Sequence, residues 1–341
     1  MRAIQFDHFG GPDVLKVVEI SRPEAGPGEV LVRVRAAGVN FFEVLIRADR
    51  YAVTPVLPMA PGVEVTGVVE HIGEGADVSL LGSRIAVPIF ALDGTGGGSA
   101  EFVTAKADGV VELPADLAFE DGAAVMVQGL TALHLIRQSP PRGKTVLVLA
   151  AAGGVGSLLV QMAKSGGARR VIATAGSEEK RGLALSIGAD CAIDYTRGDW
   201  PERVKAEGGG EGVDLIYETV GGSIGKASLD ALAPGGELVF AALGRFTLGQ
   251  EDLNRLFARN QVLRGFALLP LLSRETLPLD LGTLFARVVS GELRLLPGRR
   301  FALSDAAMAH RAIEDRSASG KVVLVPDAVS SWPRPSLRPE G

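Results

Sequence analysis

The sequence of 341 residues holds a single cysteine, Cys191, and four histidines. One thiol excludes an intramolecular disulfide and any metal site built from several thiolates. No stretch approaches the roughly 20 consecutive apolar residues of a membrane-spanning helix, and the first residues lack the apolar core of a signal peptide. The net charge of −5 gives no basic footprint for nucleic acid or an anionic membrane. We therefore expect a cytoplasmic protein with neither nucleic-acid nor membrane partners.

Aromatic residues are also scarce, at 5%, whereas glycine is abundant, at 44 residues. Residues 1–121 contain short β-branched runs that Gly and Pro interrupt, namely Val30–Val34, Val63–Val69 and Arg84–Val87. Such punctuation predicts a compact β-rich domain. We expect residues 267–326 to return to this domain, because the isolated strand Lys321–Val325 cannot bury itself. Residues 327–341 are rich in proline and predict a flexible tail.

Residues 122–266 have a different periodicity. Short, mainly apolar runs alternate there with segments whose apolar residues recur at helical spacing. The runs are Thr145–Leu149, Arg170–Ala173, Cys191–Asp194, Val213–Tyr217, Glu237–Ala241 and Val262–Ala267. Buried strands that alternate with amphipathic helices indicate a doubly wound parallel sheet. The chain is long enough for two cores, so we expect an α/β protein with this sheet in one domain and the β-rich segments in the other.

The segment Ala150–Gly156, which reads AAAGGVG, directly follows the first of these apolar runs and opens a helix. It matches the dinucleotide fingerprint G-x-G-x-x-G except at the first position, where Ala151 replaces glycine. Such a match also fits an ordinary strand-to-helix turn, but its placement between a strand and a helix favours a dinucleotide. We expect the cofactor diphosphate to contact Ala152, Gly153, Gly154, Val155 and Gly156.

The end of the next strand selects between NADH and NADPH. An NAD site carries an acidic residue there, about 20 residues after the fingerprint, which binds the ribose 2′-hydroxyl. Here the strand ends at Thr174–Ser177 without an acid, and Glu178 and Glu179 follow in the first turn of a helix that Ser177 would cap. Lys180 could reach a 2′-phosphate, although it also fits a solvated helix lysine. The missing acid, together with Ser177 and Lys180, favours NADPH.

Several motifs occur together in this chain: GVNFFEVLIR at 38–47, AAAGGVG at 150–156, GSEEK at 176–180, AIDY at 192–195 and YETVG at 217–221. In this order they resemble the zinc-independent quinone oxidoreductase (ζ-crystallin-like) branch of the medium-chain dehydrogenase/reductase superfamily. The resemblance runs from Met1 to about Pro326. It implies a GroES-like catalytic domain that a Rossmann NADPH-binding domain interrupts, and a homodimer joined through the last Rossmann strands.

The same resemblance implies the residues of the site. The 2′-phosphate contacts fall on Gly176, Ser177, Lys180 and Tyr195, and Val220 lies near the adenosine side. The residues expected near the nicotinamide half of the cofactor are Asn40, Thr131, Leu243, Gly244 and Phe266, and Lys321 is expected close to the cofactor. Asn40 also fits a turn residue, and Thr131 also fits a helix hydroxyl bonded to its own backbone.

The zinc ligands of related alcohol dehydrogenases are missing. Val63 stands at the histidine of the family's Gly-His-Glu motif, the early loop has no cysteine, and a glycine-rich run at 94–98 replaces the cysteines of the structural lobe. Without a Lewis acid to stabilise an alkoxide, the accessible reaction is hydride transfer from NADPH to an electron-poor acceptor. We expect a quinone or an enone, with Asn40 and Tyr51 as catalytic residues and Tyr51 as a helper in protonation.

Two other functions fit the same motifs. An alkenal or enoyl reductase, which acts on α,β-unsaturated carbonyl compounds, would share all of them, and a substrate panel separates the two. A non-catalytic NADPH-binding protein of structural or regulatory function would keep the glycine-rich turn and lose the nicotinamide pocket. Asn40 and Thr131 argue against that loss.

Overall fold

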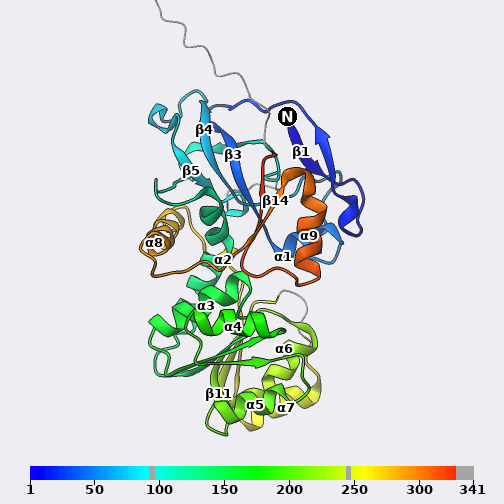
Figure 1. Cartoon of the computed structure of the whole chain (residues 1–341), viewed down its shortest axis with the longest axis vertical. Coiled ribbons are helices and arrows are strands. Elements are labelled where there is room, and N and C mark those ends of the chain that lie inside the picture. Colours follow the sequence, from blue (N-terminus) through cyan, green and yellow to red (C-terminus); the bar gives the residue numbers. More distant parts are fainter. Residues whose placement is uncertain (92–96, 243–246, 328–341) are drawn as a thin grey trace, which may run out of the picture.

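The computed structural model describes residues 1–91, 97–242 and 247–327, and two β-sheets organise it (Figure 1). The first sheet has six parallel strands in the order β10-β9-β8-β11-β12-β13. Counted along the chain this is the order 3-2-1-4-5-6, which is that of a doubly wound dinucleotide-binding sheet. The strands are β8 (Thr145–Val148), β9 (Arg170–Ala175), β10 (Cys191–Asp194), β11 (Val213–Glu218), β12 (Leu232–Phe240) and β13 (Val262–Gly265).

The strand order reverses between β8 and β11, which are neighbours in this sheet. In open parallel sheets a ligand binds outside the carboxyl ends of the strands at such a reversal. Helix α2 (Phe119–Gln138) precedes β8, and the helices between the strands are α3 (Gly154–Ser165), α4 (Glu178–Ser186), α5 (Trp200–Glu207), α6 (Gly222–Ser228) and α7 (Gln250–Ala258). All four residues of β8 are buried, which explains why three of them are apolar.

The second sheet is mostly antiparallel and has the order β14-β15-β3-β4-β5-β7, with β6 also paired to β3. Its strands are β3 (Glu29–Val39), β4 (Val65–Ile72), β5 (Arg84–Val87), β6 (Phe102–Lys106), β7 (Val111–Glu112), β14 (Arg299–Ala302) and β15 (Val322–Val325). β15 pairs antiparallel with β3, so the chain returns to this sheet after it leaves the parallel one. The predicted fold class, a β-rich half plus a doubly wound parallel sheet, is confirmed.

The remaining elements accompany the second sheet. A ribbon of two antiparallel strands, β1 (Arg2–Gln5) and β2 (Lys16–Glu19), precedes it. Three helices complete this half of the molecule: α1 (Phe41–Arg47), α8 (Leu277–Val289) and α9 (Ala306–Glu314). Within the ranges that the structure describes, no helix is both long and apolar enough to cross a membrane.

The predicted strand Val63–Val69 begins two residues too early, since β4 starts at Val65. Gly62 has a φ of +101°, and a Cβ there would lie 2.1 Å from the backbone nitrogen of Ser99. Only glycine fits such a turn without strain. The turn leaves Glu64 outside the strand, where its side chain is free to bond elsewhere.

Helix α2 joins the two halves, as Figure 1 shows. One continuous hydrophobic cluster contains Leu113 beside the second sheet, Met126 and Leu130 of α2, and Val148 of the parallel sheet. All four side chains are nearly inaccessible to solvent. Because the same core reaches both sheets, residues that follow strand ends of one sheet are held in fixed positions against the other.

Candidate cofactor and active site

The segment Ala150–Gly156 forms a tight turn between β8 and α3. A Cβ on Gly156 would lie 2.3 Å from the carbonyl oxygen of Ala150, so only glycine allows the helix to approach the strand this closely. The first helical hydrogen bond runs from Ser157 N–H to Gly153 O, at 2.9 Å. The N–H groups of Gly154, Val155 and Gly156 lie before that bond, in the first turn, where a helix offers them no acceptor. Such a helix N-terminus is a site for an anion such as a diphosphate.

The ends of β9 and β10 carry the residues expected around a 2′-phosphate. Ser177 caps α4, and its hydroxyl accepts a hydrogen bond from Lys180 N–H at 3.3 Å. A Cβ on Gly176 would contact the Tyr195 ring at 3.4 Å, so the two residues are neighbours. The Lys180 ammonium donates to the carbonyl oxygen of Arg316, and burial together with the nearby Arg316 charge lowers the pKa of Lys180. Sequence reasoning missed Arg316, which adds a second cation to this end of the site.

A buried network of polar side chains lies behind the dinucleotide turn. Asn40 follows β3 and caps α1, Glu43 lies in the first turn of α1, Glu64 precedes β4, and Lys321 precedes β15. Asn40 Nδ2 donates to Glu64 Oε1 at 2.8 Å and to Glu43 Oε2 at 3.2 Å. Lys321 Nζ donates to Asn40 Oδ1 at 2.7 Å and also to Glu64 Oε1. None of the four residues is more than 4% exposed. We call these four residues the Asn40 network.

Glu43 has an unusual environment for a carboxyl group. Its Oε1 accepts a hydrogen bond from Gly62 N–H and its Oε2 accepts one from Asn40 N–H, both at 2.8 Å. Burial nevertheless raises the pKa of Glu43 to about 7, against these donors and the Lys321 charge, all of which favour ionisation.

Two contacts attach this network to the dinucleotide-binding half. Gly320, which precedes Lys321, donates its N–H to Ala152 O at 3.0 Å and forms a parallel bridge with Gly153. Glu64 Oε2 accepts a hydrogen bond from Val127 N–H of α2 at 2.8 Å. The side chain of Thr131 donates to Val127 O at 2.6 Å, so it bonds within its own helix.

The other predicted residues lie on separate segments, and no hydrogen bond joins them to the Asn40 network within the described residues. The Tyr51 ring packs against Phe42 of α1, with ring centroids 5.8 Å apart, and burial raises the pKa of the Tyr51 hydroxyl. Val220 follows β11 and donates its N–H to Glu218 at 2.6 Å. Phe266 follows β13 and is buried. Leu243 and Gly244 lie outside the described residues.

Sequence reasoning did not select Glu43 or Glu64. The available signal was an acid inside an apolar run, Val63–Val65 with Glu64 at its centre. A buried charge requires a partner, so this position predicts a polar contact. In the ranges that the structure describes, no group of three or more His, Cys, Asp or Glu side chains could hold a metal ion.

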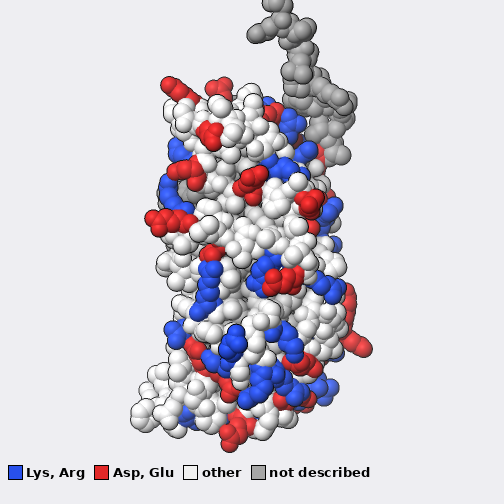
Figure 2. Space-filling view, turned by 90° about the vertical axis from the view of Figure 1, so that its left-hand side faces the viewer, with Lys and Arg blue, Asp and Glu red and all other residues white. Residues whose placement is uncertain are grey.

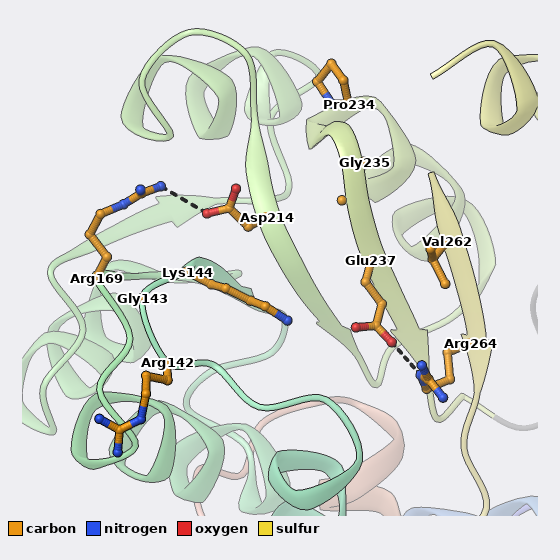
Figure 3. Close-up of a pocket in the computed structure, with 11 residues that line it drawn as sticks. Arg142, Gly143, Lys144, Arg169, Asp214, Pro234, Gly235, Glu237, Val262 and Arg264 are labelled. Atoms are coloured by element: carbon orange, nitrogen blue, oxygen red, sulfur yellow. Dashed lines mark hydrogen bonds and ion pairs between the residues drawn. The ribbon is translucent and has the colours of Figure 1, made fainter. Parts of the chain in front are cut away.

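A cavity of about 460 Å³ lies elsewhere, at the amino ends of the parallel strands (Figure 3). Arg169 pairs with Asp214 across 3.0 Å, and Arg264 pairs with Glu237. Lys144, which precedes β8, also lines the cavity. The dinucleotide turn follows the carboxyl end of β8, so this cavity is at the opposite edge of the sheet and is not the cofactor site. On the face shown in Figure 2, basic side chains are interleaved with acidic ones rather than gathered into a patch of one sign.

Comparison with known proteins agrees with this geometry. Residues 26–115 match the model of the alcohol dehydrogenase GroES-like domain, and residues 154–282 match that of the zinc-binding dehydrogenases. A quinone oxidoreductase of Pseudomonas aeruginosa is 36% identical over 333 residues, which cover 95% of this chain and 99% of that protein.

Solved structures give the same picture. The Escherichia coli quinone oxidoreductase, crystallised with NADPH, is 31% identical and superposes with a TM-score of 0.86 over 96% of this chain and all of that one. A structure described as an NAD-dependent alcohol dehydrogenase is 32% identical, with a TM-score of 0.83 over 95% of this chain and 99% of that one. The likeness to the quinone oxidoreductases extends over nearly the whole length of both chains. This protein therefore belongs to the quinone oxidoreductase family of the medium-chain dehydrogenases and reductases.

Proposed function

We propose that this protein is an NADPH-dependent reductase that transfers a hydride to a quinone or another electron-poor carbonyl acceptor without zinc. The observation that carries the proposal is the hydrogen bond between Gly320 and Ala152, at 3.0 Å. It fixes the Asn40 network of the β-rich half beside the dinucleotide turn of the parallel sheet. A cofactor bound at that turn would therefore lie beside the buried polar side chains of this network.

The residues present fit NADPH. The turn 152–156 offers backbone N–H groups to the diphosphate, and Gly156 leaves no space that a side chain could fill. The end of β9 lacks an acid and carries Ser177 and Lys180, which suit a 2′-phosphate. When bound, NADPH supplies the hydride, and this chain orients the cofactor and excludes water.

We propose a reaction without zinc because a side chain that could bind the metal is missing. Val63, at the family's histidine position, is buried and offers no lone pair. Acceptors that need Lewis-acid activation are then poor substrates, whereas quinones and enones are already electron-poor. The reduced acceptor takes up a proton, and we propose the Tyr51 hydroxyl, whose ring packs against Phe42, as its donor.

We also propose a homodimer through the last strands of the parallel sheet, in the cytoplasm. β13 is the outermost strand of that sheet, and Val262 at its start is 44% exposed. An unpaired strand edge is a template for another strand, and a second copy of this chain would cover it. Sedimentation of the full chain measures the oligomeric state.

The direct test follows NADPH oxidation by absorbance with a panel of quinones, enals and enoyl thioesters. We expect turnover with quinones, slower turnover with NADH, and no loss of activity after dialysis against a chelator. A preference for enals or enoyl thioesters would replace the quinone by an α,β-unsaturated carbonyl acceptor. NADPH binding without oxidation by any acceptor would reject the enzyme and support a binding protein.

A further inference from the structure

The proposed hydride transfer gives no task to Glu43 and Glu64, yet the fold buries both carboxylates almost completely. Taking a carboxylate out of water is costly, and a buried ion pair contributes little net stability relative to apolar residues of the same volume. Lys321 provides one positive charge for two acids. Their position beside the dinucleotide turn therefore points to a functional contribution rather than to stability alone.

Both carboxylate oxygens of Glu64 accept hydrogen bonds, and their donors differ. Oε2 accepts from Val127 N–H of α2, at 2.8 Å. Oε1 accepts from Asn40 Nδ2 at 2.8 Å and from the Lys321 ammonium. The carboxylate cannot rotate without losing a bond, so it sets the distance between the ammonium, the amide and helix α2.

Lys321 is fixed at both ends. Its backbone is held by the neighbouring Gly320, which bonds to the dinucleotide turn at Ala152 O. Its ammonium has three N–H donors, and within the described residues two acceptors bond to it, Asn40 Oδ1 and Glu64 Oε1. One donor is therefore left for a ligand oxygen.

We propose that Glu64 is a positioning residue for the cofactor: it holds the Lys321 ammonium beside the dinucleotide turn, so that the remaining N–H of Lys321 bonds an oxygen of the ribose-diphosphate part of NADPH. This assignment rests on the proposed NADPH-dependent function. Glu64 does not touch the cofactor and acts through Lys321.

A glutamine at position 64 would break this arrangement without changing its size. An amide has one acceptor oxygen, whereas Glu64 uses both oxygens as acceptors. If the amide oxygen faces Lys321 and Asn40, the amide NH2 meets Val127 N–H, and two donors oppose each other. If the amide is flipped, the NH2 group faces the ammonium, and Lys321 keeps only Asn40 Oδ1 as an acceptor. In either orientation Lys321 loses the negative charge of Glu64.

The experiment measures NADPH binding by fluorescence titration, and the thermal midpoint, for the purified full-length protein and four variants. The variants are Glu64→Gln, Lys321→Met, the double variant of these two, and Glu70→Gln. Glu70 lies on β4, the strand that follows Glu64, and pairs with Arg33, so its variant removes a carboxylate outside the site. It controls for the loss of a negative charge in this sheet.

We expect Glu64→Gln and Lys321→Met each to raise the Kd for NADPH about tenfold, the loss that goes with one hydrogen bond to a charged group. The double variant should bind NADPH like Lys321→Met alone, because Glu64 acts through Lys321. Its thermal midpoint should lie above that of Glu64→Gln, since the double variant no longer buries an ammonium that has lost the Glu64 carboxylate. Glu70→Gln should bind NADPH like wild type.

The proposal is overturned if Glu64→Gln binds NADPH within twofold of wild type, or if the double variant regains affinity together with stability. The second result would show that Glu64 only supports the fold. Should Glu64→Gln not fold, Lys321→Met decides, because unchanged NADPH affinity in that variant removes the contact that Glu64 is proposed to position. Wild-type protein that does not bind NADPH would instead reject the proposed function.

Discussion

The dinucleotide turn and the Asn40 network lie side by side, but they are built in opposite ways. The turn is one continuous segment, 150–156, and it offers backbone N–H groups that need only glycine and a helix start. The network joins side chains from distant parts of the chain, with Asn40 and Lys321 separated by 281 positions. A site made of backbone tolerates most side-chain changes except at its glycines, whereas a site made of buried charges depends on every member.

The largest expected effect tests the backbone side of this comparison. Gly156→Ala places a Cβ 2.3 Å from Ala150 O and 2.8 Å from Ala150 C. Both are backbone atoms, so no side-chain rotation can relieve the clash. We expect the unfolding free energy to fall by about 3 kcal/mol, the upper part of the range for overpacking. We also expect the Kd for NADPH to rise about a hundredfold, equivalent to about 2.8 kcal/mol. Urea denaturation and NADPH titration measure the two losses, and wild-type affinity would show that the helix start can move.

The same contrast explains what could be predicted from the sequence. The parallel sheet follows from apolar runs at regular intervals, and its fold class and the family resemblance are confirmed. The start of α3 and the Ser177 cap follow from local chemistry and are present. The domain limits and the roles of the site residues stay predictions.

Glu64 shows why the rest could not be predicted. An acid inside an apolar run indicates a buried partner, but that partner, Lys321, is 257 positions away. Hydrophobic periodicity describes one element at a time and carries no information about which strand ends meet. The network appears only when β15 pairs with β3. The predicted start of β4 is wrong for a related reason, since the turn at Gly62 depends on packing against Ser99.

The second-largest expected effect tests the Asn40 network, through the pH dependence of the stability that Glu43 contributes. Glu43 has a pKa raised from 4.5 in the unfolded chain to about 7 in the fold, mainly by burial. Between these values the folded state holds a proton that the unfolded state has released, so the stabilisation is complete below pH 4.5 and is lost as the pH rises through 7. We expect the unfolding free energy of wild type minus that of Glu43→Gln to fall over this window by on the order of 2 kcal/mol.

The measurement uses the difference between wild type and Glu43→Gln because another buried group, His310, changes the stability with pH in the opposite direction. Burial, with the Arg47 charge, lowers the pKa of His310 to about 3, so its contribution is lost as the pH falls below 6.5. Both proteins share that loss, and the subtraction removes it. Glu29→Gln is the control, since the hydrogen bond from Lys106 lowers the pKa of Glu29 and moves its titration below the window. A flat difference for Glu43→Gln, like that of the control, would mean that Glu43 is ionised in the fold throughout.

A smaller effect is expected at the adenosine end of the proposed cofactor site. Side chains there are proposed to select NADPH over NADH, whereas the dinucleotide turn binds through backbone N–H groups. Lys180→Ala removes a cation beside the Ser177 cap and should lower the preference for NADPH over NADH about tenfold, a loss of about 1.4 kcal/mol. The KM values for both cofactors measure it. Lys16→Ala, at an exposed position of β2, is the control and should leave the ratio unchanged. If Lys180→Ala also leaves it unchanged, Arg316 and Tyr195 account for the selectivity without Lys180.

The smallest expected effect is an increase in stability, at a second glycine, which can be compared with Gly156. Gly182 lies inside α4, and a Cβ there would meet no atom within 4 Å. Gly182→Ala should raise the unfolding free energy by about 0.5–1 kcal/mol, because alanine loses less conformational entropy in a helix. NADPH affinity should not change. The same substitution is thus expected to destabilise at 156 and stabilise at 182, and the difference depends only on what each Cβ touches. Urea denaturation of Gly182→Ala and Gly156→Ala side by side measures it, and equal losses at both positions would remove the close approach to Ala150 as the cause.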